Sequence, residues 1–153
     1  MAKHGRPFWE SARSAEENAS KKLPQLARAY FRAGRELFAA KPAVGAFHKF
    51  RLETKRFRYT LELFQPCYGP GLEERLKLLR NIQDLLGEIN DCATTQKLLR
   101  PQPDRISKFL ERRMALNARA LRMWWRQTFD SAGQEIWWTT YLARFARKPR
   151  RTA

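Results

Sequence analysis

The sequence is dominated by long stretches in which apolar residues recur at the spacing of an α-helix. The stretch Leu72–Ile89 shows this most clearly, with an apolar residue at every third or fourth position. Such spacing places the apolar side chains on one face of a helix. The chain has only 7 Gly residues and lacks alternating apolar and polar runs bounded by turn signals. We therefore predict an all-α fold.

Pro, Gly and capping residues indicate where the helices begin and end. Ser14 and Glu17 have the spacing of a capping box that opens the first helix, which we expect to end near Ala40. Pro24 either kinks this helix or lies in the first turn of a new one, and the sequence leaves both alternatives open. The other helical segments are expected at about 46–64, 72–89, 92–99, 104–125 and 131–146. Short connections between them predict an antiparallel four-helix bundle with a short extra helix and a C-terminal helical extension.

Three connections carry specific expectations. Pro66 should end the second helix, and Cys67–Gly71 should form a turn. Asn90 or Asp91 should cap the short segment that follows them. Asp104 should be the N-cap of the next long helix. Together these positions divide the chain into helices joined by short turns.

The length of 153 residues suits one domain with a hydrophobic core of its own. We divide the chain into a flexible N-terminal segment, 1–13, a single helical domain, 14–146, and a basic tail, 147–153. No apolar run is long enough to span a membrane, and Met1–Glu10 lacks the apolar core of a signal peptide. We therefore expect a cytoplasmic protein without a membrane partner.

The chain is strongly basic. It has 31 Lys and Arg residues against 15 Asp and Glu residues, which gives a net charge of +16. Self-repulsion of this size disfavours the compact state, and it is typical of proteins whose partner is a polyanion. Nucleic acid, an acidic membrane surface and polyphosphate are all candidates, and a soluble basic protein without such a partner is the alternative. Charge alone does not choose among them.

On the helix predicted at 46–64, the basic residues gather on one face. Successive residues of a helix are about 100° apart, so three basic residues and a Tyr lie within roughly 80° of His48 around the helix axis. This face comprises His48, Arg51, Lys55, Arg58 and Tyr59. Like charges at this spacing repel each other by a few tenths of a kcal/mol per pair. A bound anion would relieve that repulsion, so we predict that this face binds a polyanion.

Two other helices repeat this pattern, whereas the helix predicted at 72–89 mixes acidic and basic residues. The further basic residues are Arg28, Arg32 and Arg35 in the first helix, and Arg112, Arg119, Arg122 and Arg126 in the helix that begins near residue 104. Three basic stripes beside one neutral helix predict a charged groove. The alternative is that each stripe is an ordinary solvated face.

His48 does not belong to a recognisable catalytic or metal site. No Ser, Cys or Asp at a suitable spacing completes a catalytic pair with it. The only other His in the sequence is His4, so a shared metal site is not expected. His48 can instead donate a hydrogen bond to a phosphate oxygen in either protonation state. We therefore predict no catalytic residue, no metal and no cofactor.

Two motifs follow one another in the middle of the chain. The run from His48 to Phe64 reads H-x-x-R-x-x-x-K-R-x-R-Y-x-x-E-x-F, and the run from Leu79 to Asp91 reads L-x-x-x-Q-D-x-L-G-x-x-N-D. In this order they resemble the two signatures of the CHAD family, the conserved-histidine α-helical domain. The resemblance implies an all-helical domain that binds inorganic polyphosphate and is associated with polyphosphate granules. On the binding surface it implies His48, Arg51, Lys55, Arg56, Arg58 and Tyr59.

The chain is shorter than the resemblance implies, because the usual domain holds two four-helix halves and this chain has room for one. Two pairs of adjacent Trp residues, Trp124–Trp125 and Trp137–Trp138, bear on this point. Neighbours on a helix point about 100° apart, so one core cannot easily accommodate both members of each pair. We predict a homodimer with a broad apolar face between the subunits. A monomer, or Trp side chains exposed for ligand stacking, are the alternatives.

Three functions are compatible with these features. The first is non-catalytic binding of inorganic polyphosphate through the basic stripes. The second is non-specific binding of single-stranded DNA or RNA, with Trp side chains stacking on the bases. The third is hydrolysis of phosphoanhydrides, which normally needs Mg²⁺ held by carboxylates, whereas Glu62 is the only acid on the basic stripe of the second helix. We favour the first.

Overall fold

The computed structural model describes residues 9–101 and 103–149. Its helices are α1 (Ala15–Ala39), α2 (Val44–Leu63), α3 (Gln65–Tyr68), α4 (Glu73–Leu98), α5 (Asp104–Trp124) and α6 (Gln134–Arg144). A 3₁₀ turn, Gly69–Leu72, joins α3 to α4, and a π-helical turn, Trp125–Phe129, follows α5. No strand occurs in the part of the chain that is described, so the fold is all-α, as the sequence predicts. None of these helices is both long and apolar enough to cross a membrane.

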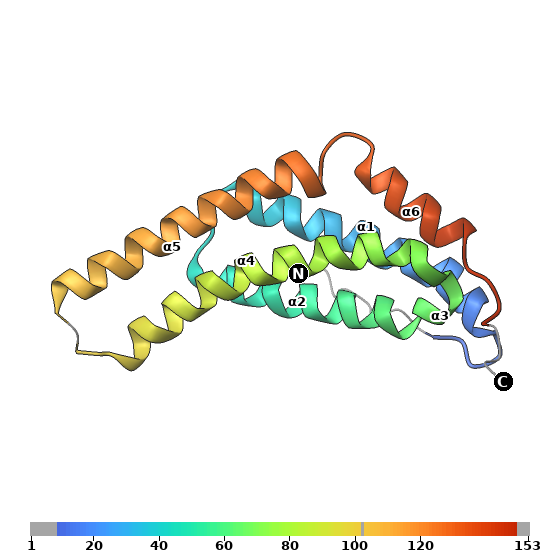
Figure 1. The fold of residues 1–153 in the computed structure, drawn as a ribbon, viewed down its shortest axis with the longest axis horizontal. Coiled ribbons are helices and arrows are strands. Elements are labelled where there is room, and N and C mark those ends of the chain that lie inside the picture. The colour runs from blue at the N-terminus through green and yellow to red at the C-terminus, as the bar shows by residue number, and fades with distance from the viewer. Residues whose placement is uncertain (1–8, 102, 150–153) are drawn as a thin grey trace.

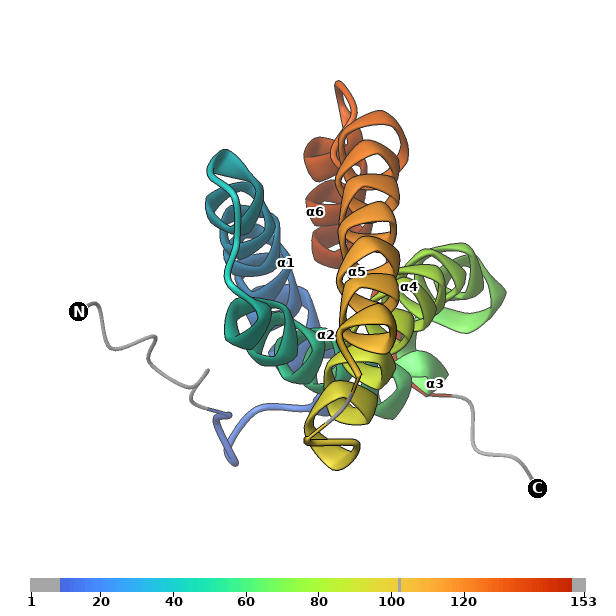
Figure 2. The ribbon, with the colours of Figure 1, turned by 90° about the vertical axis from the view of Figure 1, so that its left-hand side faces the viewer.

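Successive long helices run in opposite directions and lie side by side (Figure 1). α1 packs against α2 and α6, and α4 packs against α2 and α5. The end of α5 and the whole of α6 share the fourth position of the bundle. Beyond Asn90, where α4 makes its last hydrogen bond to α2, the rest of α4 and the first half of α5 project from the bundle (Figures 1 and 2). We call these two helix ends, 91–98 and 104–116, the arm.

The core is rich in aromatic rings. Trp125, Phe129 and Trp138 are almost completely buried and pack on rings of α1 and α2. The ring of Tyr30 packs edge-on against Trp125 and Phe129, and its hydroxyl lies 2.8 Å from Oγ1 of Thr54. Each Trp pair is divided: Trp125 and Trp138 lie in the core, whereas Trp124 is partly buried against it and Trp137 is exposed. The predicted C-terminal helical extension is α6, and it completes the core by folding back onto α1.

The predicted start of the first helix is confirmed. The side chain of Ser14 accepts a hydrogen bond from the backbone N–H of Glu17, and the Glu17 carboxylate accepts one from the backbone N–H of Ser14. α1 then runs without a break through Pro24, which is buried within it. Pro24 therefore lies inside one continuous helix rather than in the first turn of a new one.

Three boundaries differ from the expectation. α4 continues through Asn90 without a break, because the side chain of Asn90 bonds to His48 of α2 instead of capping a new helix. The short helix α3 and the 3₁₀ turn replace the simple turn predicted at 67–71. Pro103 is the N-cap of α5, and Asp104 is its first residue, where a negative charge favours the positive end of the helix dipole.

Both terminal segments contact the bundle where they are described. Trp9, in the segment predicted at 1–13 to be flexible, packs on Phe64 with ring centroids 5.0 Å apart. At the other end, the backbone N–H of Arg147 donates to the carbonyl of Cys67 at 2.8 Å. Residues 1–8 of the first segment and 150–153 of the predicted basic tail lie outside the described residues.

Candidate functional site

The two sequence motifs meet where α2 packs against α4. Nδ1 of His48 lies 3.0 Å from Oδ1 of Asn90, and Nε of Arg58 donates to Oε1 of Gln83 at 3.0 Å. In each pair, one residue comes from the first motif and the other from the second. Because the two helices are antiparallel, the residues between these bonds face each other. The α2–α4 site, as we call it, comprises His48, Arg51, Lys55 and Arg58 of α2 with Gln83, Gly87 and Asn90 of α4.

Helical spacing places the site residues of each helix in one row. Members of a row are three or four positions apart, which aligns them on one face. The opposite side of α2 is fixed in the core by Phe50, Phe57 and Leu61. The basic row is therefore held at the surface, beside α4.

Arg51 and Lys55 have no acidic partner among the residues that the structure describes. Neither side chain forms a salt bridge with any described carboxylate. Both side chains are half-buried, and Nε of Arg51 is fully buried without an acceptor. A buried donor without a partner costs free energy, and the two like charges repel each other. An anion bound here would supply acceptors and would offset both costs.

The bond to Asn90 orients the ring of His48. In the tautomer that bonds to Oδ1 of Asn90, Nδ1 of His48 carries the hydrogen, because a carbonyl oxygen can only accept. The remaining nitrogen, Nε2, can then donate to an anion only when the ring is protonated.

Acidic residues neutralise the Arg58 end of the site. Arg58 bonds to the Glu62 carboxylate as well as to Gln83. Arg80 of α4 bonds to Glu73 and lies 3.8 Å from the same Glu62 carboxylate. Unpaired positive charge is therefore concentrated at the other end of the site, beside His48.

The remaining α2 residues predicted to bind, Arg56 and Tyr59, lie outside the α2–α4 site. The guanidinium of Arg58 stacks on the Tyr59 ring, 4.5 Å from its centroid. Arg56 is exposed and lies about 100° around the helix from Lys55. Neither residue bonds to the second motif.

Arg28 and Arg35 line a hollow between α1 and the residues around the start of α6, and Arg32 shares the face of α1 that carries Arg28. Arg28 and Arg32 are exposed. Arg35 donates to both carboxylate oxygens of Asp130, at 2.9 and 2.6 Å, and pairs with Glu135. Arg35 therefore fastens α1 to the residues around the start of α6, and its charge is used within the protein.

The basic stripe of α5 is divided between two roles. Arg122 and Arg126 donate to the carbonyl of Phe38, in the last turn of α1. Cations at this position satisfy free carbonyl groups and favour the negative end of the helix dipole. Arg112 and Arg119 continue the row of Arg126 at seven-residue spacing and are exposed. The prediction of one groove lined by all three stripes is therefore wrong, and only the α2 row meets the second motif.

A family model, the CHAD domain, matches residues 2–100. The matched range holds both motifs and the helices α1 to α4. The chain belongs to the CHAD family. No curated protein and no solved structure matches it. The match ends before α5, although α6 contributes the buried Trp138 and Leu142 to the core of this CHAD domain.

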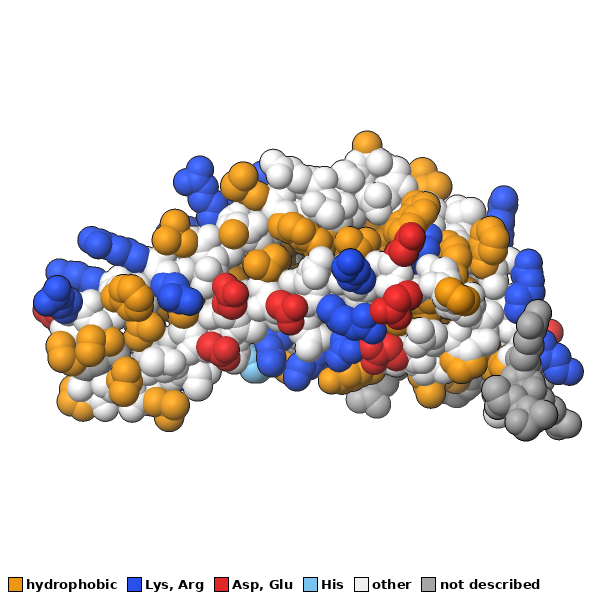
Figure 3. Space-filling view, viewed as in Figure 1, with side chains coloured by type: hydrophobic (Ala, Val, Ile, Leu, Met, Phe, Trp, Pro, Cys, Tyr) orange, Lys and Arg blue, Asp and Glu red, His pale blue; other side chains and the backbone are white. Residues whose placement is uncertain are grey.

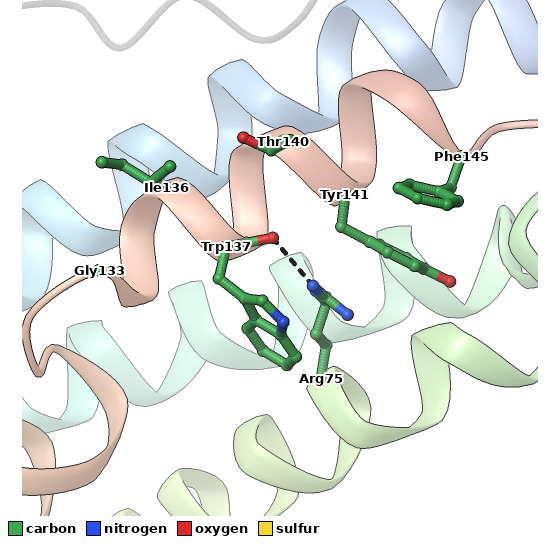
Figure 4. Close-up of a pocket in the computed structure, with 7 residues that line it drawn as sticks. All are labelled: Arg75, Gly133, Ile136, Trp137, Thr140, Tyr141 and Phe145. Carbon is green, nitrogen blue, oxygen red and sulfur yellow. Dashed lines mark hydrogen bonds between the residues drawn. The ribbon is translucent and has the colours of Figure 1, made fainter.

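A separate hollow of the CHAD domain lies between α4 and α6 (Figure 4). Arg75 reaches into it between the rings of Trp137 and Tyr141, 3.4 and 3.8 Å from their centroids. Its Nη2 donates to the Trp137 carbonyl at 2.9 Å, and its Nη1 donates to the Gly71 carbonyl at 3.3 Å. Burial lowers the pKa of Arg75 to about 10, which leaves it charged at neutral pH. Two aromatic rings pack on its guanidinium and both Nη atoms donate to carbonyls, while its Nε is buried without a partner, so Arg75 fastens α6 to α4.

Charge patterning does not find Gln83, Gly87 and Asn90, because none of them is charged. The second CHAD motif contains all three, and their spacing shows that they share one face of α4. The motif is therefore the signal that could have identified them from the sequence.

Proposed function

We propose that this CHAD domain binds inorganic polyphosphate at the α2–α4 site without hydrolysing it. The observation that carries the proposal is the placement of Arg51 and Lys55, two half-buried cations without an acidic partner where two family motifs meet. The resemblance to the family supplies the ligand class, and the net charge of +16 supports a polyanion. Exposed Arg side chains on α1 and α5 would add long-range attraction. The expected place of action is the cytoplasm, at polyphosphate granules.

Polyphosphate suits this site because it offers closely spaced negative charge and no bases. Arg51 and Lys55 can bind its oxygen atoms through charge-assisted hydrogen bonds. Protonated His48 would add a further donor through Nε2. This mode of binding requires no aromatic stacking.

Non-specific nucleic-acid binding is the second candidate, and the aromatic residues argue against it. Proteins that bind single strands commonly stack bases on exposed aromatic rings. Trp125 and Trp138 are buried, Trp124 is partly buried against the core, and the exposed ring of Trp137 already carries the guanidinium of Arg75 on one face. Beside the α2–α4 site, Tyr59 is exposed, but Arg58 covers one face of its ring. A charge of +16 still predicts some affinity for nucleic acid.

Retention of long-chain polyphosphate by the purified protein at physiological ionic strength tests the proposal. We expect the logarithm of the binding constant to fall linearly with the logarithm of the salt concentration, because each neutralised phosphate releases counterions. Absence of binding at this salt, or stronger retention of single-stranded DNA of the same charge, would refute it.

The bound chain should remain intact. Cleavage of phosphoanhydrides normally needs Mg²⁺ held by carboxylates next to the phosphates. Glu62 is engaged by Arg58, and within residues 9–101 and 103–149 no three His, Cys, Asp or Glu side chains are grouped so that they could hold a metal ion. We expect no orthophosphate above background when polyphosphate is incubated with the protein and Mg²⁺. Metal-dependent release that Glu62→Gln abolishes would show the opposite.

We also propose that the protein is a homodimer joined through the arm and the adjoining face of α5. Hydrophobic side chains gather on the arm (Figure 3), where Leu98 is 78% exposed. On α5, the exposed Phe109, Leu116 and Met123 recur every seven residues. Exposed apolar side chains gathered in this way are typical of a surface that contacts another protein chain. A second copy of the chain would cover them.

Replacing Phe109 and Leu116 together by Glu should convert this dimer into a monomer, because the new charges would be buried at the interface. Light scattering over a range of protein concentrations measures the effect. Leu63→Glu is the matched control, because Leu63 is 74% exposed on α2, outside the arm. Wild-type protein that stays monomeric at high concentration would rule out the homodimer.

A further inference from the structure

Gly87 lies in the middle of the α2–α4 site, and nothing in the fold requires glycine there. Its backbone does not have a positive φ, in contrast to Gly69 and Gly133. A Cβ atom added to it would meet no heavy atom within 4 Å. Glycine is the least favourable residue in a helix interior after proline. α4 therefore carries a destabilising residue for which neither packing nor backbone conformation gives a reason.

A Cβ added to Gly87 would point into free space, which we call the opening. Gln83 and Asn90, about one turn away on either side, each reach α2 through a hydrogen bond. Gly87 is itself half-buried, yet no side chain fills the place next to it. The α2 residues between the two bridges are Arg51 and Lys55. Gly87 thus lies on α4 between the two polar bridges, and Arg51 and Lys55 lie on α2 between the same two bridges.

We propose that a phosphoryl group of polyphosphate sits against Gly87, and that this contact makes the site selective for polyphosphate over nucleic acid. The inference rests on the proposed function. In polyphosphate the bridging oxygens join each phosphorus only to further phosphoryl groups, so no sugar keeps a phosphoryl group from entering the opening and reaching Arg51 and Lys55. In nucleic acid each phosphate bears two sugars, and the axes of packed helices are only about 8–10 Å apart. The phosphates of nucleic acid would therefore contact only cations outside the opening.

Gly87→Ala should have opposite effects on stability and binding. The melting temperature should rise by about 2–4 °C, because alanine favours the helix and meets no neighbour. Affinity for long-chain polyphosphate should fall at least about tenfold, because the methyl group displaces the phosphoryl group from its donors. Affinity for single-stranded DNA of the same charge should be unchanged. Both affinities are measured by titration at one fixed salt concentration.

Gly45→Ala is the matched control. Gly45 lies in α2, and a Cβ added there also meets no heavy atom within 4 Å. This variant should bind both polyanions like the wild type. Gly87→Leu fills more of the opening and should weaken polyphosphate binding further than Gly87→Ala does.

The outcomes separate this inference from the proposed function. Wild-type protein that does not bind polyphosphate refutes the proposed function itself, and the role of Gly87 with it. Wild-type protein that binds, with Gly87→Ala binding equally tightly, overturns only the role of Gly87. The role of Gly87 is also overturned if Gly87→Ala lowers the affinities for polyphosphate and for DNA equally. Loss of the dimer together with polyphosphate binding in this variant has the same consequence.

Discussion

Replacing Arg51 and Lys55 together by alanine should weaken polyphosphate binding by about a hundredfold or more. A hydrogen bond to a charged group contributes roughly 1.5–3 kcal/mol, and about 1.4 kcal/mol corresponds to a tenfold change in affinity. Helical content should be unchanged, because neither side chain pairs with a described carboxylate. Calorimetric titration measures the affinity, and circular dichroism measures the helix. The salt dependence of binding should also become shallower.

Lys77→Ala/Arg144→Ala is the matched control for this variant. It removes one Lys and one Arg from exposed positions of α4 and α6, outside both the α2–α4 site and the arm. If net charge alone governed binding, the two double variants would be weakened equally. That result, or loss of helical structure in Arg51→Ala/Lys55→Ala, would show that the two residues are not a binding site.

Gly34→Ala should have the largest effect on stability, with the opposite sign to Gly87→Ala. A Cβ atom on Gly34, which is buried in α1, would overlap with the ring of Trp125. That ring cannot move aside, because Tyr30 and Phe38 pack around it. We expect overpacking to lower the free energy of unfolding by about 3 kcal/mol, which is roughly 10 °C in melting temperature. This loss should exceed the gain in helix propensity.

Thermal unfolding followed by circular dichroism measures the effect, and Gly45→Ala is again the control. The added methyl group at Gly45 meets no neighbour, so that variant should be as stable as the wild type or slightly more stable. Wild-type stability of Gly34→Ala would mean that α1 does not approach Trp125 as closely as the core packing requires.

Local signals in the sequence account for most of the helix boundaries. The capping box at Ser14 and Glu17 starts α1, and Pro- and Gly-containing turns separate the long helices. These signals fail where a side chain has a partner far along the chain. Asn90 has the residue type of an N-cap, but its amide bonds to His48, 42 positions earlier, and α4 runs on.

The basic stripes show the same limit at the level of the site. Periodicity places Arg35 on a basic face of α1. Its partner Asp130 lies 95 positions away, and the pattern of α1 does not predict this ion pair. Arg126 likewise bonds to the carbonyl of Phe38 in another helix. Periodicity tells which residues share a helix face, whereas packing decides which faces meet. The sequence therefore predicts the α2 row but cannot separate it from cations that hold the fold together.

The claim that the α2–α4 site selects polyphosphate is tested most directly by competition. Labelled long-chain polyphosphate bound to the wild-type protein is displaced by unlabelled polyphosphate or by single-stranded DNA, and fluorescence anisotropy at physiological ionic strength follows the displacement. We predict that polyphosphate competes at least about tenfold better per phosphate than DNA does. Equal or better competition by DNA would mean that the protein recognises negative charge in general and that the α2–α4 site has no preference for polyphosphate.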